Sequence, residues 1–441
     1  MELVCIPEMV WEKYASMKIV LVNYRYFISG GPERYYFNIK EILENNGHIV
    51  VPFSIKNNRN FPTEYEEYFL NAVGDDNVYF AQMKKTIKTI IKSFFRMFYS
   101  FEAKRKFKKL LHNTQPDLVY IMHYHNKISP SIIDVAKKCK IPVVHRISDF
   151  QYICPNALLY SDNKGICEDC LNGKYFNCIR YKCVFNSYIY SGLKLFAKVL
   201  SELLGITKKI DAFVVPSSFT LNKLNQYGIP LSKLHHIPTF FNVKDSVIDI
   251  RYEPYMLFIG RIEKEKGLMT LIKAFENTSY NLKIIGFSNN RYEDELKTYL
   301  QNKQHNIEFL GRMEFNEIIP YFSSCLCTVV PSECYDNFPN VILESFAYQK
   351  AVIATNIGSL PELVRNNETG LTFEYTSADS LRVKIEYIFN NQSEAQRMGE
   401  NAYQILMNDY SPEKHYSTLL ELFHSLVNSD GLFRNSIPIV F

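Results

Sequence analysis

Short apolar runs of strand length recur along this chain of 441 residues, and stretches with helical spacing separate them. The first run, residues 18–23, leads through a turn at Gly30 and Gly31 into a helical pattern that ends at Gly47, and residues 48–52 form the next run. This order of strand, glycine turn, helix and strand is typical of the opening of a Rossmann-like domain. The alternation predicts an α/β fold in which helices cover both faces of parallel sheets.

The apolar runs form two series, which predicts two domains. After the opening unit, the first series comprises residues 118–122, 142–144 and 213–215. The second series comprises residues 255–260, 282–286, 307–311, 325–330 and 351–354. Three runs of the second series end in glycine, where a tight turn lets a ligand approach the carboxyl edge of a parallel sheet.

The polar segment 240–254, which contains the turn pair Glu253-Pro254, marks the expected boundary between the domains. We expect residues 17–245 to form the first domain and residues 252–410 to form a second, nucleotide-binding domain. A C-terminal helix at 411–428 is expected to rejoin the first domain.

Composition agrees with a folded protein, since 47% of the residues are hydrophobic. The net charge of +4 is small for this length and argues against a nucleic-acid partner. We find neither a basic N-terminal region followed by an apolar run nor an uncharged apolar stretch of about 18 residues, so the sequence predicts a cytoplasmic protein.

The segment from Gly260 to Gly267 carries the strongest chemical signal. It reads Gly-Arg-Ile-Glu-Lys-Glu-Lys-Gly and stands directly after an apolar run and before an amphipathic helical pattern. Arg261 and Lys266 can converge on a diphosphate there, the guanidinium as a planar fork and the ammonium as a point charge. A solvated charged turn is the alternative interpretation of these eight residues.

A second signal is the segment 331–347, in which two carboxylates, Asp336 and Glu344, stand eight positions apart. Between them a helix is expected to open, and its free N–H groups can bind a phosphate or sugar hydroxyls. The residues at this helix start are Phe338, Pro339, Asn340 and Val341. A capped core helix with incidental acids is the alternative, but this segment and the Arg261 turn lie at the same predicted sheet edge.

Together these segments resemble glycosyltransferase family 4, the retaining glycosyltransferases of the GT-B fold, in which two Rossmann-like domains face each other across a cleft. The match consists of G-R-x4-K-G at Gly260 to Gly267 and the acid-x7-Glu motif at Asp336 to Glu344. The resemblance extends through residues 351–371, 215–219 and 237–242 to the glycine pair near the N-terminus.

The resemblance implies a role for each matched residue. Arg261 and Lys266 neutralise the donor diphosphate, which is electrostatic catalysis that requires no cofactor. Asp336, whose side chain is one methylene shorter than the family's usual Glu, holds hydroxyls of the transferred sugar. Glu344 accepts hydrogen bonds from the nucleotide ribose. Gly30, Gly31 and Gly260 let the backbone approach the donor.

On the acceptor side, the segment 144–155 departs from the family pattern of His-Asp-aromatic before Cys-Pro. Asp149 and Phe150 keep the second and third members, while Ser148 stands where the His is expected. Asp149 is therefore the acceptor-side candidate of this segment, and His145 is a weaker one. His125 and Asn126, at the end of another predicted strand, fit a further family pattern at the acceptor cleft.

Five cysteines fall within thirty residues, and two of them form a Cys-x2-Cys pair. They are Cys154, Cys167, Cys170, Cys178 and Cys183. A structural zinc site fits this content, although the last two are not spaced as a second pair. Free thiols or a labile disulfide are the alternatives.

Residues 84–111 hold the one clear concentration of positive charge, with ten Lys or Arg facing only Glu102, and aromatic residues recur there at helical spacing. Such a basic amphipathic segment can lie on an anionic membrane surface. A crossover helix with a solvated basic face is the alternative.

The sequence thus predicts a retaining glycosyltransferase that moves a sugar from a nucleotide-sugar donor to a hydroxyl of a glycan or lipid-linked glycan. Synthesis of a surface polysaccharide, at the inner face of the membrane, is the expected setting. The alternatives are a GT-B epimerase or phosphorylase and a non-catalytic protein that binds sugar nucleotides.

Overall fold

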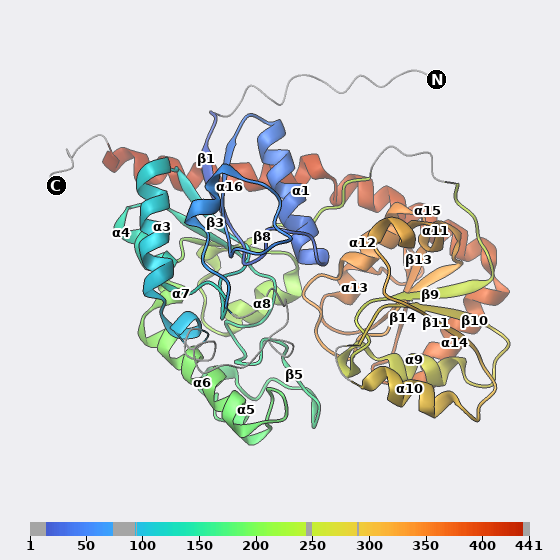
Figure 1. The fold of residues 1–441 in the computed structure, drawn as a ribbon. Helices are drawn as coiled ribbons and strands as arrows, with labels where there is room; N and C mark the ends of the chain where they lie inside the picture. The colour runs from blue at the N-terminus through green and yellow to red at the C-terminus, as the bar shows by residue number, and fades with distance from the viewer. Residues whose placement is uncertain (1–14, 74–92, 94, 244–248, 289–290, 435–441) are drawn as a thin grey trace, which may run out of the picture.

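The computed structural model describes residues 15–73, 93, 95–243, 249–288 and 291–434. Two parallel six-stranded sheets, each covered by helices on both faces, lie side by side (Figure 1). This is the predicted pair of Rossmann-like domains.

The first sheet has the strand order β2-β1-β3-β4-β7-β8. Its strands are β1 (Lys18–Val22), β2 (Ile49–Phe53), β3 (Leu118–Ile121), β4 (Val143–Arg146), β7 (Ala212–Val215) and β8 (Leu234–His236). Its helices are α1 (Gly31–Asn45), α3 (Phe101–Thr114), α4 (Ser131–Lys138), α7 (Ile206–Lys209) and α8 (Ser218–Gln226). An excursion between β4 and β7 contains the hairpin β5 (Tyr160–Ser161) and β6 (Gly165–Ile166) and the helices α5 (Asn177–Arg180) and α6 (Tyr188–Leu203).

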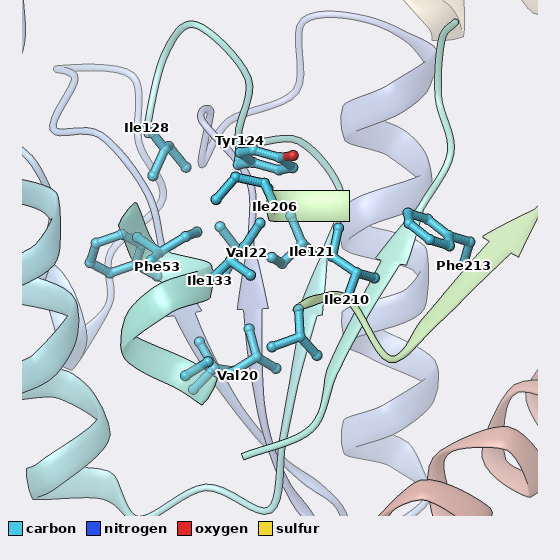
Figure 2. Close-up of a cluster of buried hydrophobic side chains, with 14 of the residues drawn as sticks. Val20, Val22, Phe53, Ile121, Tyr124, Ile128, Ile133, Ile206, Ile210 and Phe213 are labelled. Atoms are coloured by element: carbon cyan, nitrogen blue, oxygen red, sulfur yellow. The ribbon is translucent and has the colours of Figure 1, made fainter. Parts of the chain in front are cut away.

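The alternation of side chains along β1 builds two cores, one on each face of this sheet. Val20 and Val22 point into a cluster closed by α3, α4 and α7, which Figure 2 shows around Ile121, Ile133 and Phe213. Ile19 and Leu21 point into the opposite cluster. These four side chains of β1 are fully buried, as expected for a central parallel strand.

The second sheet has the order β11-β10-β9-β12-β13-β14. Its strands are β9 (Tyr255–Ile259), β10 (Asn281–Ile285), β11 (Asn306–Gly311), β12 (Cys327–Val330), β13 (Ala351–Thr355) and β14 (Gly370–Phe373). Its helices are α9 (Leu268–Phe275), α10 (Tyr292–Leu300), α11 (Phe315–Ser324), α12 (Asn340–Ala347), α13 (Leu360–Leu363), α14 (Ala378–Asn390) and α15 (Gln392–Asp409).

The C-terminal helix α16 (Pro412–Arg434) runs from the second domain back across the first (Figure 1). Its residues Leu419, Leu420 and Phe423 pack with Ile19 and Leu21 in the second core of the first sheet. The last helix of the chain therefore belongs to the core of the first domain and ties the two domains together.

Within the described residues, no helix combines the length and the apolar composition that crossing a bilayer requires.

Candidate active site

The Arg261 turn leaves β9 at the carboxyl edge of the second sheet and ends at Gly267, which adopts a left-handed φ of 69°. A Cβ at Gly267 would stand 1.9 Å from the carbonyl oxygen of Pro331, so only glycine fits there without a shift of the backbone. The N–H of Glu333 donates to the carbonyl of Glu265 at 2.8 Å. The two signal segments of the sequence are thus bonded to each other.

Lys266 and Asp336 form an ion pair, with 2.5 Å between Nζ and Oδ1. Burial opposes the charge of Lys266, but the Asp336 carboxylate outweighs it and raises the pKa of the ammonium. The Ser332 hydroxyl donates to Oδ2 of Asp336 at 2.5 Å, and the Ser359 hydroxyl donates to its carbonyl oxygen at 2.6 Å. Asp336 is therefore held in place from both sides.

Arg261 is the accessible cation of this site, since 47% of its side chain is exposed. Its Nη2 lies 3.1 Å from Oε1 of Glu265, which is mostly buried. Such a guanidinium can turn toward an anionic ligand while Lys266 holds a fixed position, so the turn presents one mobile and one fixed positive charge.

Glu344 lies in helix α12 and is 4% exposed. Burial raises the pKa of its carboxyl, and the charge of Arg34 opposes this shift. Arg34 belongs to helix α1 of the first domain, and its Nη2 lies 2.5 Å from Oε1 of Glu344. The acid that the resemblance assigns to the ribose is thus paired across the domain interface.

The glycine pair at the start of α1 faces the start of α12. A Cβ at Gly31 would stand 2.6 Å from Nδ2 of Asn340, so the absence of a side chain lets the two helix starts approach. Phe338 to Val341 lead into α12 with Pro339 as its N-cap residue and no side-chain cap. Free N–H groups of that helix start are therefore directed toward the first domain.

Two further contacts join the domains and were not predicted from the sequence. Asn337 donates to the carbonyl oxygen of Ile147 at 2.8 Å, and its Oδ1 accepts from the Thr220 hydroxyl at 2.6 Å. Glu362 accepts from the backbone N–H groups of Ser218 and Phe219, which open helix α8. A lone Asn or Glu in a loop carries no sequence signal for such a contact.

On the acceptor side, the loops after β3 and β4 bring Asp149, His125 and Asn126 to the carboxyl edge of the first sheet. Asp149 accepts from the backbone N–H of Gln151 at 2.9 Å and lies two residues after Ile147, which contacts the second domain. The His125 ring stacks on Tyr124 with 3.9 Å between ring centroids. Burial lowers the pKa of His125 well below its usual value, which keeps this ring neutral.

His145, the weaker acceptor-side candidate, is largely shielded from solvent in the structure. His145 lies within strand β4, is 3% exposed, and its Nδ1 lies 2.9 Å from the Tyr152 hydroxyl. Burial lowers its pKa to about 3. We therefore assign His145 a structural role beneath the acceptor loops.

The basic segment also differs from the single helix that its spacing suggests. Residues 84–92 and 94 lie outside the described residues, while residues 95–98 are helical and a new helix, α3, begins at Phe101 with Ser100 as its cap. Arg96 is buried, and its guanidinium pairs with Glu102. Arg96 is therefore part of the packing and does not contribute to a solvated basic face.

The cysteines of the excursion are all free thiols. Cys170 and Cys178 share a buried cluster with Cys183 packed against it, and burial raises the pKa of Cys170 to about 12. Within the described part of the chain, however, no three His, Cys, Asp or Glu side chains are placed to hold a metal ion. The structural zinc site considered from Cys154, Cys167, Cys170, Cys178 and Cys183 stays a prediction that metal analysis can test.

Two cations and two acids thus gather at the carboxyl edge of one Rossmann-like sheet, opposite a second such sheet. The pair of parallel-sheet Rossmann-like domains is the architecture of the GT-B fold. A family model described as "Glycosyl transferases group 1" matches residues 247–405, and one described as "Glycosyltransferase Family 4" matches residues 29–245. The chain belongs to glycosyltransferase family 4.

Curated relatives agree with this assignment. The chain is 25% identical over 358 residues to a 42.6 kDa protein in the cps region of Klebsiella pneumoniae, covering 79% of this chain and 88% of that protein. It is 26% identical over 181 residues to the capsular polysaccharide biosynthesis glycosyltransferase CapM of Staphylococcus aureus, covering 40% of this chain and 47% of CapM.

Solved structures share the fold. Sucrose-phosphate synthase from Thermosynechococcus elongatus superposes with a TM-score of 0.68 at 18% identity, covering 94% of this chain and all of that one. Anabaena Alr3699/HepE in complex with UDP-glucose superposes with a TM-score of 0.62 at 15% identity, again over 94% of this chain and all of that one. At such identities the likeness shows the GT-B fold alone.

Proposed function

We propose that this glycosyltransferase is a retaining enzyme that transfers a sugar from a nucleotide-sugar donor to a hydroxyl of a glycan or lipid-linked glycan. The observation that carries the proposal is the convergence of Arg261, Lys266, Asp336 and Glu344 at one sheet edge, with the acceptor loops of the first domain opposite. A diphosphate between Arg261 and Lys266 places the sugar near Asp336 and the ribose near Glu344.

In this scheme Arg261 and Lys266 stabilise the negative charge that develops on the leaving diphosphate. Lys266 is paired with Asp336 in the structure without a donor, so the ammonium is already held in position when a donor binds. The acceptor hydroxyl attacks from the face that the diphosphate leaves, which retains the anomeric configuration. Asp149, at the opposite sheet edge, is the acid nearest to the acceptor side.

A donor screen tests the proposal. Nucleotide sugars are added singly and the unfolding midpoint is measured; a donor at 100 times its dissociation constant adds about 2.7 kcal/mol of stability. UDP-sugars are tested first, because Anabaena Alr3699/HepE, which shares the fold, was solved in complex with UDP-glucose. Release of the nucleoside diphosphate from a stabilising donor supports transfer, whereas binding without release favours a non-catalytic binding protein. A donor sugar returned as its epimer would favour an epimerase.

The setting that we propose is the synthesis of a surface polysaccharide. It is supported by the similarity to a protein in a cps region and to CapM. A glycan acceptor carried on a lipid fits this setting, and it would place the enzyme at the cytoplasmic face of a membrane.

Helix α6 supports contact with a membrane, because its apolar side chains face outward. Ile189 is 76% exposed and Leu203 is 80% exposed, whereas Lys198 is buried and donates to the carbonyl of Tyr152 at 2.6 Å. Among the large hydrophobic side chains that the described residues expose, five belong to this outer face of α6: Tyr188, Ile189, Phe196, Val199 and Leu203.

Exposed basic residues, among them Lys174, Arg180 and Lys208, flank this outer face in the sequence. A surface that combines bulky apolar side chains with nearby cations suits the interface of an anionic bilayer. The continuation toward residues 84–92 lies outside the described residues. We therefore centre the proposed contact on α6.

We expect the double variant Ile189→Asp/Leu203→Asp to co-sediment with anionic vesicles at least about tenfold less than the wild type. Each substitution removes an apolar side chain whose burial in the bilayer interface would contribute more than about 1 kcal/mol. Val383→Asp is the matched control, since Val383 is 60% exposed but lies on α14 of the second domain. Equal sedimentation of all three proteins, or none by the wild type at low salt, would exclude this contact.

The pH dependence of stability tests the environment of Asp149. Burial raises the pKa of its carboxyl to about 6. Since this lies above the usual value of about 4, ionising Asp149 disfavours the fold, and its unfavourable contribution grows between about pH 4 and pH 6 and then stays level.

We expect Asp149→Asn to be more stable than the wild type at pH 7, by on the order of 1 kcal/mol, because water at the sheet edge reduces the full effect. Near pH 4 the two proteins should be equally stable. Urea unfolding at both pH values measures this, and a difference that does not change with pH would contradict the assignment.

A further inference from the structure

Among the residues that the structure describes, two lysines beside the acceptor loops have no anionic partner. Lys127 directly follows Asn126 in the loop after β3, and Lys194 lies on the inner face of α6. Among the described residues, neither ammonium has a hydrogen bond or an ion pair. Lys194 lines a cavity of about 40 Å³ together with His125, Asn126 and Gln151. Lys127 does not line this cavity, but it lies close enough to Lys194 for the two charges to interact.

The neighbouring cations differ from these two, because each has a carboxylate of its own. Arg25 pairs with Glu33 at 3.2 Å, Arg96 with Glu102 at 3.2 Å, and Lys198 with Glu202 at 3.0 Å. These acids are therefore already engaged.

Within the described part of the chain, Asp149 is the remaining acid near Lys194, and it favours the charged ammonium without an ion pair between the two. Burial lowers the pKa of Lys194, and it lowers that of Lys127 to about 8, where the charges of Arg25 and Lys194 add to the effect. The site is thus electropositive and short of negative charge.

The remaining polar groups of the site suit an anion. The pKa of His123 is lowered to about 3 by burial and by the nearby Lys194 and Lys127, so its ring is neutral and offers one N–H. His125 is neutral for the same reason. With the amide groups of Asn126 and Gln151, the cavity provides donors from three loops or helices around one small space.

We propose that this cavity, which Lys194 lines and Lys127 adjoins and which we call the Lys127–Lys194 pocket, binds an anionic group of the acceptor, a phosphate or a carboxylate. The inference rests on the proposed function, since it assigns a substrate class to the acceptor side of that enzyme. The volume suits one small charged group and excludes a sugar ring. The position of the pocket also fits an acceptor site. Gln151 lies two residues after Asp149, and the same loop contacts the donor domain through the carbonyl of Ile147.

Unpaired charges of this kind weaken a fold when no ligand is present. A purely structural lysine would be expected to have a partner, as Lys198 has. We therefore expect that replacing one of these two lysines weakens anion binding but does not lower the stability of the free protein.

The test uses the full chain loaded with UDP, which occupies the donor diphosphate site. Inorganic phosphate and glucuronate are titrated separately by calorimetry into the wild type, Lys127→Met, Lys194→Met and the control Lys208→Met, whose lysine is exposed in the same domain. We expect one of the two anions to bind the wild type and the control, and to bind about tenfold or more weakly to each pocket variant. Without anion, Lys194→Met should unfold at the same or a higher temperature than the wild type.

A preference for phosphate indicates a phosphorylated or lipid-phosphate acceptor, and a preference for glucuronate indicates an acidic sugar. No binding of either anion to the UDP-loaded wild type, or equal binding by all four proteins, would overturn the pocket. If UDP does not bind but another nucleotide from the donor screen does, that nucleotide replaces UDP in the titration. If none binds, the result counts against the proposed function, and the anion titration is then read in an Arg261→Ala/Lys266→Ala background.

Discussion

Replacing Arg261 or Lys266 with alanine is expected to lower the rate of nucleoside diphosphate release at least about tenfold, and toward a hundredfold for Lys266. In the proposed mechanism each cation faces the position where negative charge develops on the leaving group, and losing one such contact raises the barrier by at least about 1.4 kcal/mol. Lys266 should matter more, because it is fixed by Asp336, whereas Arg261 is half exposed.

Lys264→Ala is the matched control for this pair. Lys264 lies in the same turn, but its side chain is 52% exposed and its nearest acid, Glu295, is 4.0 Å away. Turnover within about twofold of the wild type is expected for it. Near-normal turnover of both the Arg261 and the Lys266 variant would show that the diphosphate does not bind at this turn.

The second large effect is expected from Glu344→Ala, which should weaken donor binding about 10- to 100-fold. A buried carboxylate that accepts from ribose hydroxyls contributes about 1.5–3 kcal/mol, and its loss leaves those hydroxyls and Arg34 without a partner. Titration of UDP by calorimetry measures the change.

Glu344→Gln should lie between the wild type and the alanine variant, because the amide keeps one acceptor oxygen. Glu308→Ala, at an exposed position of β11, should leave the UDP affinity unchanged. If Glu344→Ala binds UDP as tightly as the wild type, the carboxylate does not contact the nucleotide.

Much of the fold could be predicted from the sequence because central parallel strands are continuous apolar runs. The run at 282–286, for example, differs by one residue from β10 at Asn281–Ile285. The edge strands β8 and β14 were not predicted. Leu-His-His and Gly-Leu-Thr-Phe are short and partly polar, because one side of an edge strand needs no apolar neighbour.

The candidate site could be predicted only as far as its motifs are local. Gly267 and Asp336 belong to short motifs that can be recognised from neighbouring residues in the sequence, although the contact between the two motifs is visible only in the structure. Arg34, by contrast, reaches Glu344 across 310 positions of the chain, and only the closed approach of the two domains brings them together. The spacing in α6 likewise indicates an amphipathic helix, but not that its apolar face points outward.

A crystal structure of the protein with UDP tests the assignment most directly. We predict the β-phosphate within hydrogen-bond distance of Arg261 and Lys266, near the start of α12, and the ribose hydroxyls on Glu344. A nucleotide seated elsewhere in the chain, with the Lys266–Asp336 pair undisturbed and no phosphate beside it, would contradict it.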